Sequence, residues 1–572
     1  MQAQDPQAEA FVAWFTANQG WIDPGCTLQH VPGMGRGLVA TRAFAENERV
    51  FSIPRNILMN LGTSSLETEC LAAESAKPSD NKVTWSELVE RGWCPLILML
   101  MYEHWRAKQG ANPSWGPYFG MYIANADVMP SKFDTPMFWT QEEIQNLNGT
   151  DVVDKIGQAD AERDYSECVL PYIQQYPRVF VGTEGDDAAE SIQQYYNLEI
   201  YHRMGSSILS RSFHVKRDLK HAEADDADIH SVPAEVSVQR EIPGEDEGEE
   251  VQLEQVDEED EEENDDEDEE EEDEDVRDIS MVPMADMLNA RFGSENTRLF
   301  YKREVLEMRC TKPVAIGEQL LNTYGNPPNS DLLRRYGFVD EPNRGDLVEL
   351  PAELVVEAAV SKIVLATGAS QAEVEAMTAA RFEWACTELG MDEVFLLSRL
   401  SKPEAEAPFG STLSLDVTQP AVSQKKALSR AAAHIPEDLV SFARLLCVPQ
   451  PGFAKAQKRG ALPNARLDAI EEFDMQGPRT AEGRTLHLAV ASVLLEAMDK
   501  RLAQYPLGWQ QTAEVLRTCT EPPNTPHRMA LVVRAGDQTI LTEHTTVLRL
   551  ILDQSTAERV PRSDSAKKQR KA

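Results

Sequence analysis

A nearly continuous acidic run divides this chain into two parts that must fold around it. Of residues 257–275, eighteen of the nineteen are Asp or Glu. Charges at this density repel one another, and the run has too little apolar surface to offset the conformational entropy lost on folding. The segment "ISMVPMADMLNA" (279–290) follows almost at once and is mostly apolar. We therefore predict a solvated surface loop that leads into a buried part of the fold.

The acidic run also carries most of the net charge. Residues 244–275 contain 24 acidic residues and no Lys or Arg, so without them the formal charge of −41 becomes −17 over the other 540 residues. A moderately acidic surface does not suit the phosphate backbone of nucleic acid, so we expect no direct nucleic-acid partner. A basic protein is the more suitable partner. The run is either a plain solvated loop or a segment that steers such a partner, an effect that salt would weaken.

Length and cysteine usage limit the class of protein further. A chain of 572 residues is too long for one hydrophobic core and should form two or three domains. Its eight cysteines are scattered without a CxxC pair, which argues against a zinc site and against a disulfide framework. The longest apolar run, "CPLILMLMY" (94–102), is too short to span a membrane, and the N-terminus does not have the pattern of a signal peptide. We expect a soluble protein of the nucleus or cytoplasm, with no metal site and no membrane partner.

Two strand-rich segments lie far apart in the sequence. Residues 28–60 alternate β-branched residues with Gly-rich turns, and residues 279–325 have the same character. Residues 62–215 between them have helical periodicity, as do residues 351 to about 520. The simplest interpretation is one β domain, interrupted by a helical insertion and followed by a helical domain.

Three other segments have clear local patterns. Residues 8–20 predict a short amphipathic helix with three aromatic residues on one face. The sequence "TLHLAVASVLLEAMDKRLAQY" (485–505) predicts the strongest helix of the C-terminal part. The sequence "MALVVRAGDQTIL" (529–541) has a Gly-Asp pair between two apolar runs, a pattern that predicts a β-hairpin.

Four short motifs could carry chemistry: "GMGRGL" (33–38), "SRSF" (210–213), "MADMLNA" (284–290) and "NTYGNPPNSDLLRRYGF" (322–338). The first does not have the GxGxxG spacing and no helix follows it, so a dinucleotide site is not expected there. A strand–turn–strand corner rich in Gly would instead let a ligand lie against bare backbone, although a simple hairpin turn has the same pattern. Each motif is a weak signal when taken alone.

Together and in this order, the motifs resemble those of the SET-domain lysine methyltransferases. The segments that carry the resemblance are "SWGPYF", "HxR…SRSF", "VPMADMLN", "IGEQLLNTYG" and "LRRYGFV", and it extends from about residue 20 to 555. The nearest branch is the Rubisco large-subunit methyltransferase-like one, and within it the fungal ribosomal lysine N-methyltransferase 4 group with its animal nuclear relatives. The resemblance implies an α+β protein, in which a SET β-fold split by a helical insertion is followed by an all-α substrate-binding domain.

The patterns and the resemblance together predict the domain organisation. The expected segments are the N-terminal part of the SET domain (1–61), the helical insertion (62–277) ending in a disordered acidic loop (about 216–277), the C-terminal part of the SET domain (278–345), the helical substrate-binding domain (346–555) and a basic disordered tail (556–572). The tail sequence "KKQRK" could be a nuclear-import signal. The sequence does not specify an oligomeric state.

The resemblance implies S-adenosylmethionine as the cofactor. The residues that match the family's cofactor-binding positions are Met34, Gly35, Arg36, Arg211, Asn289, Ala290, Tyr324 and Tyr336. In the family the Gly-rich turn contacts the cofactor through backbone groups, the residue matching Arg211 sits over it, and the one matching Asn289 hydrogen-bonds it. The family pattern at 289–290 is usually Asn-His, so Ala290 is a departure that is tolerated if this position contributes only backbone groups.

The resemblance also implies a methyl-transfer channel between two tyrosines. Tyr324 would point into the channel as the catalytic residue, and Tyr336 would form the opposite wall. On the substrate side the matching residues are Trp115, Ser212 and Asp286. Each has a structural alternative: Tyr324 as a turn residue, Asp286 as a brace of its own turn and Trp115 as a packing residue.

The chemistry of methyl transfer explains these residue types. The transfer is an in-line displacement that requires a neutral lysine, and deprotonating a lysine of pKa about 10.4 at about pH 7.4 requires roughly 4 kcal/mol. A narrow aromatic channel and the positive sulfonium both lower that pKa. Phenol rings exclude water while their oxygens orient the amine, so no catalytic acid–base pair is needed.

From these observations we expect a protein-lysine N-methyltransferase that acts on a basic ribosomal protein. The alternatives are methylation of a chromatin or transcription-related protein, methylation of a histidine, and a non-catalytic protein whose acidic loop acts as a chaperone of basic proteins.

Overall fold

The computed structural model describes most of the chain outside the acidic run. The described residues are 5–32, 34–77, 83–110, 115–122, 134–215, 279–291, 293–341, 343–400, 428, 431–463 and 481–557. They form two compact units. Unit 1 comprises Met1–Ser131 and Ala159–Gly325, and unit 2 comprises Lys132–Gln158 and Asn326–Ala572. The domain boundaries expected from the sequence stay predictions.

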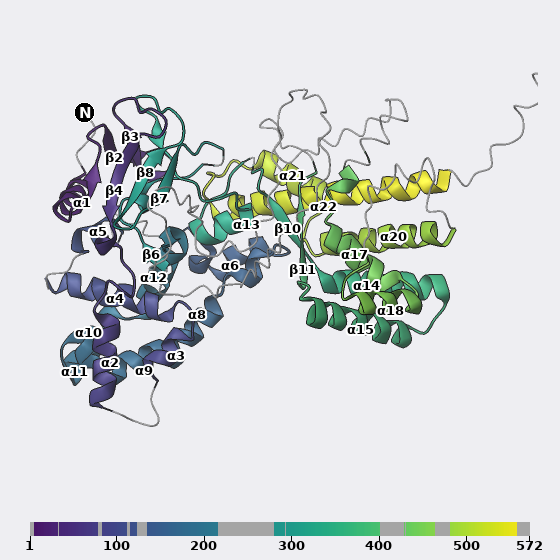
Figure 1. Cartoon of the computed structure of the whole chain (residues 1–572), viewed down its shortest axis with the longest axis horizontal. Coiled ribbons are helices and arrows are strands. Elements are labelled where there is room, and N and C mark those ends of the chain that lie inside the picture. Colours follow the sequence, from purple (N-terminus) through teal and green to yellow (C-terminus); the bar gives the residue numbers. More distant parts are fainter. Residues whose placement is uncertain are drawn as a thin grey trace, which may run out of the picture. The chain divides into compact units, whose positions relative to one another are not determined.

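A four-stranded antiparallel sheet in unit 1 joins the two strand-rich parts of the sequence. In spatial order its strands are β1 (Trp21–Ile22), β4 (Arg49–Pro54), β8 (Val305–Cys310) and β7 (Thr297–Tyr301). Ile53 of β4 lies opposite Leu306 of β8, although the whole helical insertion separates them in the sequence. Figure 1 shows β4, β8 and β7 side by side. The prediction that distant segments form one β-fold is therefore confirmed.

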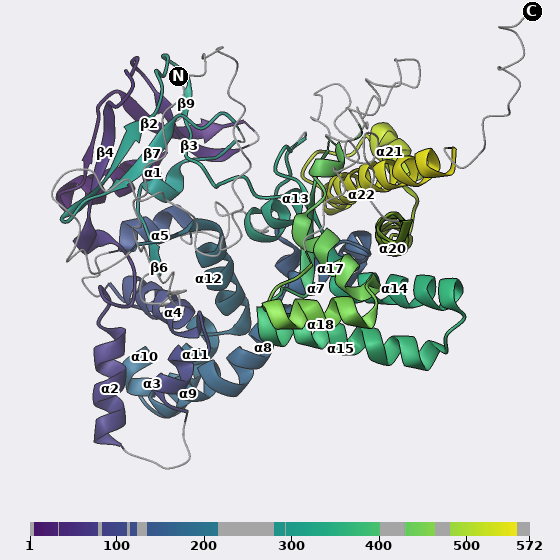
Figure 2. The ribbon, with the colours of Figure 1, turned by 45° about the vertical axis from the view of Figure 1, so that its right-hand side comes forward.

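A second sheet carries the Gly-rich turn. Its strands are β2 (Cys26–Val31), β3 (Gly35–Ala40) and β9 (Gln319–Leu320), all antiparallel to their neighbours. Leu38 in the middle strand lies opposite Leu28 on one side and Leu320 on the other. Leu38 and Leu320 are fully buried, so the middle of this sheet belongs to the core. Figure 2 shows the three strands together.

The smallest sheet closes the helical insertion. β5 (Ser212–His214) pairs antiparallel with β6 (Ile279–Met281), so that Ser212 lies opposite Met281. Met59, which follows β4, forms an isolated bridge with Met281 on the other side. The end of the "SRSF" motif is therefore tied to the start of the "VPMADMLN" segment.

The first helix, α1 (Pro6–Ala17), follows from its sequence. The Asp5 side chain accepts hydrogen bonds from the backbone N–H groups of Gln7 and Ala8, and proline occupies the first helical position. Phe11 and Phe15 lie one turn apart and are fully buried. The predicted amphipathic helix is confirmed.

The insertion is helical, as predicted. Its helices in unit 1 are α2 (Leu66–Ala76), α3 (Trp85–Val89), α4 (Cys94–Lys108), α5 (Gly116–Tyr122), α9 (Leu170–Gln175), α10 (Pro177–Val181), α11 (Asp186–Tyr195) and α12 (Leu198–Arg211); α8 (Gln158–Asp164) begins at the boundary of the unit. Every residue of α4 from Cys94 to His104 is buried. A helix that is apolar on all sides needs neighbours all round, and α3, α5, α10 and α12 all pack against α4.

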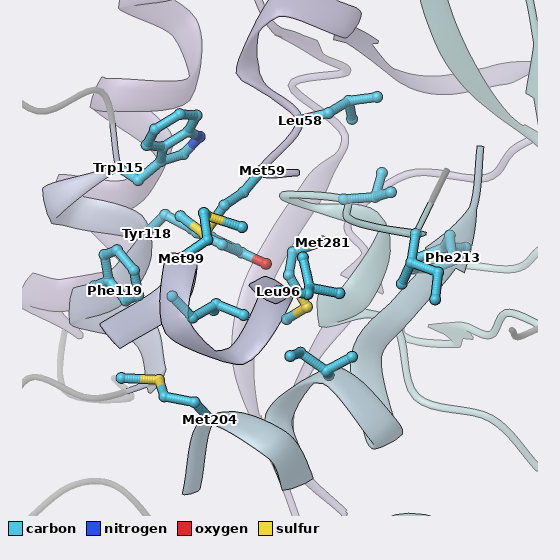
Figure 3. Packing of buried hydrophobic residues seen from close by; sticks show 14 of the residues in the cluster. Leu58, Met59, Leu96, Met99, Trp115, Tyr118, Phe119, Met204, Phe213 and Met281 are labelled. Carbon is cyan, nitrogen blue, oxygen red and sulfur yellow. The ribbon is translucent and has the colours of Figure 1, made fainter. Parts of the chain in front are cut away.

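The insertion and the β-fold share one hydrophobic core. Figure 3 shows side chains from several elements packed together there. The labelled residues are Leu58, Met59, Leu96, Met99, Trp115, Tyr118, Phe119, Met204, Phe213 and Met281. Because the residues that precede and follow the insertion pack against its helices, the insertion supports the geometry of the β-fold.

Unit 2 is mainly helical. Its helical segments are η2 (Pro136–Phe138), α6 (Gln141–Ile144), η3 (Gln145–Leu147), α7 (Val152–Lys155), α13 (Asn329–Asp331), η7 (Leu332–Tyr336), α14 (Ala352–Thr367), α15 (Gln371–Leu389), α17 (Glu437–Cys447), α18 (Gln450–Arg459), α20 (Ala481–Ala503), α21 (Trp509–Thr518) and α22 (Pro526–Ala557). Figure 2 shows α14, α15, α17 and α18 side by side. α20 confirms the strong helix expected around 485–505. A ribbon of β10 (Leu347–Pro351) and β11 (Val394–Ser398) departs from the all-α domain expected here.

The β-hairpin predicted at 529–541 is wrong, because the whole segment lies inside α22. Residues 529–541 are all buried, so the two apolar runs that suggested strands belong to one helix buried among its neighbours. Gly536 is not a turn residue. A Cβ atom at this position would lie 2.8 Å from Oδ2 of Asp346, so glycine allows the carboxylate to approach the helix backbone.

Two sequence predictions lie outside the described residues: the acidic loop (216–277) and the basic sequence "SAKKQRKA" (565–572). Within the described part of the chain, none of the helices combines the length and the apolar character that a membrane span requires.

Candidate active site

The Gly-rich motif forms a tight turn between β2 and β3. The backbone N–H of Met34 donates to the carbonyl of Val31 at 3.1 Å, and Gly35 has a left-handed φ of 73° that favours glycine. A Cβ atom on Gly35 would meet nothing within 4 Å, so the turn leaves open space beside its backbone. The strand–turn–strand corner expected from the sequence is confirmed; Gly33 lies outside the described residues.

Arg36 uses its side chain for support. Its Nε donates to Asp5 Oδ2 at 2.7 Å, and its two terminal nitrogens donate to Gln7 Oε1 at 2.7 Å and to the carbonyl of Met121 at 3.1 Å. The guanidinium therefore holds α1 and the end of α5 against the turn. Three of the five guanidinium N–H groups are thus used for support, which is compatible with the backbone contact implied by the resemblance.

Two amide side chains meet beside Gly37. Asn289 Nδ2 donates to Gln319 Oε1 at 2.6 Å, and Gln319 Nε2 lies 3.4 Å from the sulfur of Met34. A Cβ atom on Gly37 would overlap Gln319 Oε1 and lie 2.7 Å from Asn289 Nδ2. Sequence reasoning missed Gln319 and the role of Gly37. Their roles depend on the pairing of "GRGL" with "GEQL" in one sheet, which the sequence alone does not specify.

The "MADMLNA" motif forms a short, buried turn. It begins at Met284, which is fully buried and has a left-handed φ of 83°, a conformation that non-glycine residues rarely adopt. The turn η6 (Ala285–Met287) follows. Asp286 Oδ2 accepts a hydrogen bond of 2.5 Å from the hydroxyl of Tyr118. A strained turn held by a buried hydrogen bond is typical of functional segments.

Tyr118 is a second residue that sequence reasoning missed. It lies in the "SWGPYF" segment from which Trp115 was chosen, and it is 1% exposed. The contact with Tyr118 ties the turn of Asp286 to α5, which is compatible with the structural alternative that Asp286 braces this turn. A role of Asp286 toward a substrate stays a prediction.

Arg211 connects the end of α12 to this turn. Its Nη1 donates to the backbone carbonyl of Asp286 at 3.0 Å. Asn197, at the start of α12, fixes the helix by accepting from the backbone N–H of Ile200 at 3.0 Å. Ser212 follows Arg211 directly and is buried as the first residue of β5. The structure thus brings together the "SRSF" and "MADMLNA" motifs.

The segments around Asn289 and Tyr324 run side by side. Ala290 forms a parallel bridge with Asn322, and the backbone N–H of Asn322 donates to the carbonyl of Asn289 at 3.0 Å. At Ala290 the backbone is therefore placed by pairing with a neighbouring segment and not by its side chain. This agrees with the view that position 290 contributes backbone groups.

Tyr324 lies against the same turn. Its hydroxyl donates to the carbonyl of Leu288 at 3.1 Å. Burial raises the pKa of Tyr324, the positive charge of Arg211 opposes this rise, and the negative charge of Asp286 adds to it. The hydroxyl is therefore protonated at neutral pH and acts as a donor to this carbonyl.

Trp115 lies in the hydrophobic core of unit 1. It is 4% exposed, and its indole N–H donates to the carbonyl of Ile57 at 3.0 Å. Figure 3 shows its ring beside Met59 and Tyr118 in this core. These contacts support the packing alternative, and a role of Trp115 on the substrate side stays a prediction.

Tyr336 belongs to unit 2, where it ends the π-helical turn Leu332–Tyr336. The centroid of its ring lies 6.2 Å from that of Phe338. Tyr324 belongs to unit 1, so the pairing of these two tyrosines across a channel stays a prediction.

Comparison with known proteins agrees with the resemblance seen in the motifs. No family model matches the chain. It is 29% identical over 354 residues to ribosomal lysine N-methyltransferase 4 of Saccharomyces cerevisiae, covering 61% of this chain and 59% of that protein. It is 26% identical over 335 residues to the human N-lysine methyltransferase SETD6, covering 57% of this chain and 53% of the human protein. The chain thus spans between half and three fifths of these relatives.

Solved structures extend the comparison to nearly the whole chain. The crystal structure of the SET domain of LSMT bound to lysine and AdoHcy superposes with a TM-score of 0.53 at 15% identity, covering 96% of this chain and 94% of that one. The structure of Rubisco LSMT bound to AdoMet gives a TM-score of 0.50 over the same shares. The suspected resemblance to SET-domain lysine methyltransferases is therefore confirmed, and the structural likeness shows the SET fold.

Proposed function

We propose that this chain is an S-adenosylmethionine-dependent protein-lysine N-methyltransferase. The observation that carries the proposal is the meeting of three separate motifs around one turn of unit 1: Asn289 with Gln319 beside the Gly-rich turn, and Tyr324 against the carbonyl of Leu288. These segments are distant in the sequence and carry the residues that match the family's cofactor-binding positions.

The residues around the Gly-rich turn fit S-adenosylmethionine. Open space beside Gly35 leaves the backbone of Met34–Arg36 accessible to a ligand. Asn289 donates through Nδ2 to Gln319, and its Oδ1 remains able to accept from an amino group of the cofactor. When bound there, S-adenosylmethionine supplies a methyl group on a positively charged sulfur.

Tyr324 is suited to orient the substrate amine. Its proton is committed to the carbonyl of Leu288, so its oxygen can accept a hydrogen bond from a lysine N–H. The raised pKa of Tyr324 keeps the ring neutral, which avoids an anion that would stabilise the unreactive ammonium form of the lysine. Orientation of the amine and exclusion of water then account for the role of this residue.

The substrate that we propose is a lysine of a basic ribosomal protein. The name of the yeast relative supports the ribosomal assignment, and the 24 acidic residues of 244–275 support a basic partner. We also propose a nuclear location on the basis of "KKQRK" near the C-terminus. A fluorescent fusion with and without 565–572 tests the location, since only the complete chain should accumulate in the nucleus.

The experiment that tests the activity compares the purified chain with a Tyr324→Phe variant. Both are incubated with methyl-labelled S-adenosylmethionine and a ribosomal fraction. The complete chain should label a discrete basic protein, and the variant should lose on the order of 100-fold of that rate because the amine is no longer oriented. Tyr301→Phe is the matched control: Tyr301 lies on β7, and the change should leave labelling unaltered.

A second function is favoured by the acidic run. A chain that uses residues 244–275 as a chaperone would retain basic proteins at low salt and label none of them. Absence of labelling in every fraction, combined with salt-sensitive retention of basic proteins, would replace the enzymatic proposal with this one.

A further inference from the structure

The loop between α21 and α22 of unit 2 brings together three side chains of different chemistry. Cys519, Glu521 and His527 each offer one atom, Sγ, a carboxylate oxygen and a ring nitrogen, and these atoms lie within 4.8 Å of one another. Cys519 and His527 are half-buried, and Glu521 is exposed. In the part of the chain that the structure describes, this is the one group of three or more such residues. Its spacing, C-x-E-x₅-H, differs from the CxxC pairs sought in the sequence.

The geometry is close to that of a tetrahedral zinc site. Zn–S distances of about 2.3 Å and Zn–N and Zn–O distances of about 2.0–2.2 Å place neighbouring ligand atoms roughly 3.4–3.6 Å apart. His527 Nδ1 and Glu521 Oε1 are 2.9 Å apart, so they would separate by about half an ångström on binding. The longer separations involve Cys519 Sγ and are at most 4.8 Å, so the sulfur would approach the other two atoms by at most about 1.3 Å.

Three prolines lie in and next to the loop that carries the ligands. Pro522, Pro523 and Pro526 restrict its backbone, so little conformational entropy is lost when an ion binds. The hydroxyl of Thr525 donates to Glu521 Oε2 at 2.8 Å. This bond orients the carboxylate and leaves Oε1 facing His527, as an outer-shell hydrogen bond does in metal sites.

We propose that Cys519 Sγ, Glu521 Oε1 and His527 Nδ1 bind one Zn²⁺ ion, with water as the fourth ligand. A thiolate and an imidazole select zinc or a similar transition ion over Mg²⁺ and Ca²⁺, which prefer oxygen ligands. Binding releases the thiol proton of Cys519 to solvent. The ion would tie the loop to the first turn of α22 and would not take part in the proposed methyl transfer.

The alternative is a surface ion pair between His527 and Glu521, with Cys519 nearby by chance. Cobalt binding separates the two, because Co²⁺ in a tetrahedral site with a thiolate gives visible d–d bands and a sulfur-to-metal charge-transfer band. The complete chain, first freed of metal, is titrated with Co²⁺ in excess Mg²⁺. Mg²⁺ saturates the carboxylates of 244–275 without competing for a thiolate site.

One equivalent of Co²⁺ should produce the charge-transfer band. Added Zn²⁺ should displace the Co²⁺ ion and remove the band. Cys519→Ser should abolish the band, and His527→Gln should weaken Zn²⁺ affinity at least about tenfold, since even outer-shell changes cost that much. Cys386→Ser is the matched control, because Cys386 is another half-buried thiol of unit 2. An unchanged band in Cys519→Ser, or no band in the complete chain, would overturn the proposal.

Thermal unfolding gives a second readout that does not depend on the spectrum. Zn²⁺ should raise the Tm of the complete chain and of Cys386→Ser, because an ion that binds only the folded state stabilises it. It should not raise the Tm of Cys519→Ser. Equal shifts in all three proteins would mean that zinc binds elsewhere and would also overturn the proposal.

Discussion

Gln319 Oε1 accepts a hydrogen bond of 2.6 Å from Asn289 Nδ2, and through it β9 holds the end of the "MADMLNA" motif at the Gly-rich turn. The second amide atom of Gln319 reaches the sulfur of Met34 in that turn. One side chain thus fixes the positions of two segments that we propose to contact the cofactor. Gln319 is a positioning residue in this arrangement.

Gln319→Leu should raise the KM for S-adenosylmethionine roughly fivefold and change kcat little, because losing a hydrogen bond of about 1 kcal/mol releases Asn289. Gln319→Glu keeps the acceptor for Asn289 and should restore most of the affinity. Steady-state kinetics of the three proteins checks this. A fall in kcat with an unchanged KM would show that Gln319 does not act through cofactor binding.

Gly37→Ala should destabilise unit 1 by about 1–3 kcal/mol, since the new Cβ atom overlaps Gln319 Oε1 and crowds Asn289. Cofactor affinity should fall with it. Gly116→Ala is the control, because a Cβ atom on Gly116 would meet nothing within 4 Å. Urea unfolding of both variants provides the comparison, and equal midpoints would contradict the crowding that we infer.

Tyr118→Phe removes the hydroxyl that donates a hydrogen bond to Asp286 inside the core. A buried carboxylate that loses a hydrogen bond destabilises the fold by about 1–3 kcal/mol. We expect a lower free energy of unfolding together with reduced methylation. Asp286 belongs to the turn that accepts a hydrogen bond from Arg211 and leads to Leu288, the partner of Tyr324. A variant with unaltered stability would mean that the Tyr118 bond contributes nothing net.

Asp346 in unit 2 should make stability depend on pH. It accepts hydrogen bonds from the backbone and side chain of Asn329, and burial raises the pKa of Asp346 to about 7 from its ordinary 3.8. Between these values the folded state binds more protons than the unfolded state, so the free energy of unfolding falls as pH rises from about 4 to about 7 and then levels off.

Asp346→Asn removes this titration. The stability of the natural chain relative to the variant should therefore decrease with rising pH by at most about 1.36 kcal/mol per unit inside that window. Urea unfolding at three pH values between 4.5 and 8 (roughly) measures the difference. A constant difference across the series would show that Asp346 has the same pKa in both states.

The β-fold could be predicted because its signals are local and repeated. The strand character of the segments around Ile53 and Leu306, together with the motif order, was sufficient to expect them in one β domain, where the structure shows that they pair. The hairpin prediction at 529–541 was wrong because the local pattern there is ambiguous. Two apolar runs around a Gly-Asp pair are also compatible with a buried helix, and the tertiary packing of α22 decides in favour of the helix.

Site residues could be predicted where they stand at a fixed position of a recognisable motif. They could not be predicted where their role depends on a contact with a side chain distant in the sequence. Asn289 and Tyr324 stand in recognisable motifs. Tyr118 and Gln319 act through contacts with residues far away in the sequence, and nothing in their own segments marks them as partners of Asp286 and Asn289. Such pairings depend on register and on the turns that connect the strands, which a single sequence specifies only weakly.

The pairing of β5 with β6 determines how much the chain can vary in length between these two strands. His214 and Ile279 lie on adjacent strands, so the ends of the stretch between them are already held together by the sheet. Doubling the length of a connection between fixed ends adds only about 0.6 kcal/mol of closure entropy. Insertions, deletions or a grafted domain between 216 and 277 should therefore leave the fold intact. New binding segments could be added at this position without loss of stability.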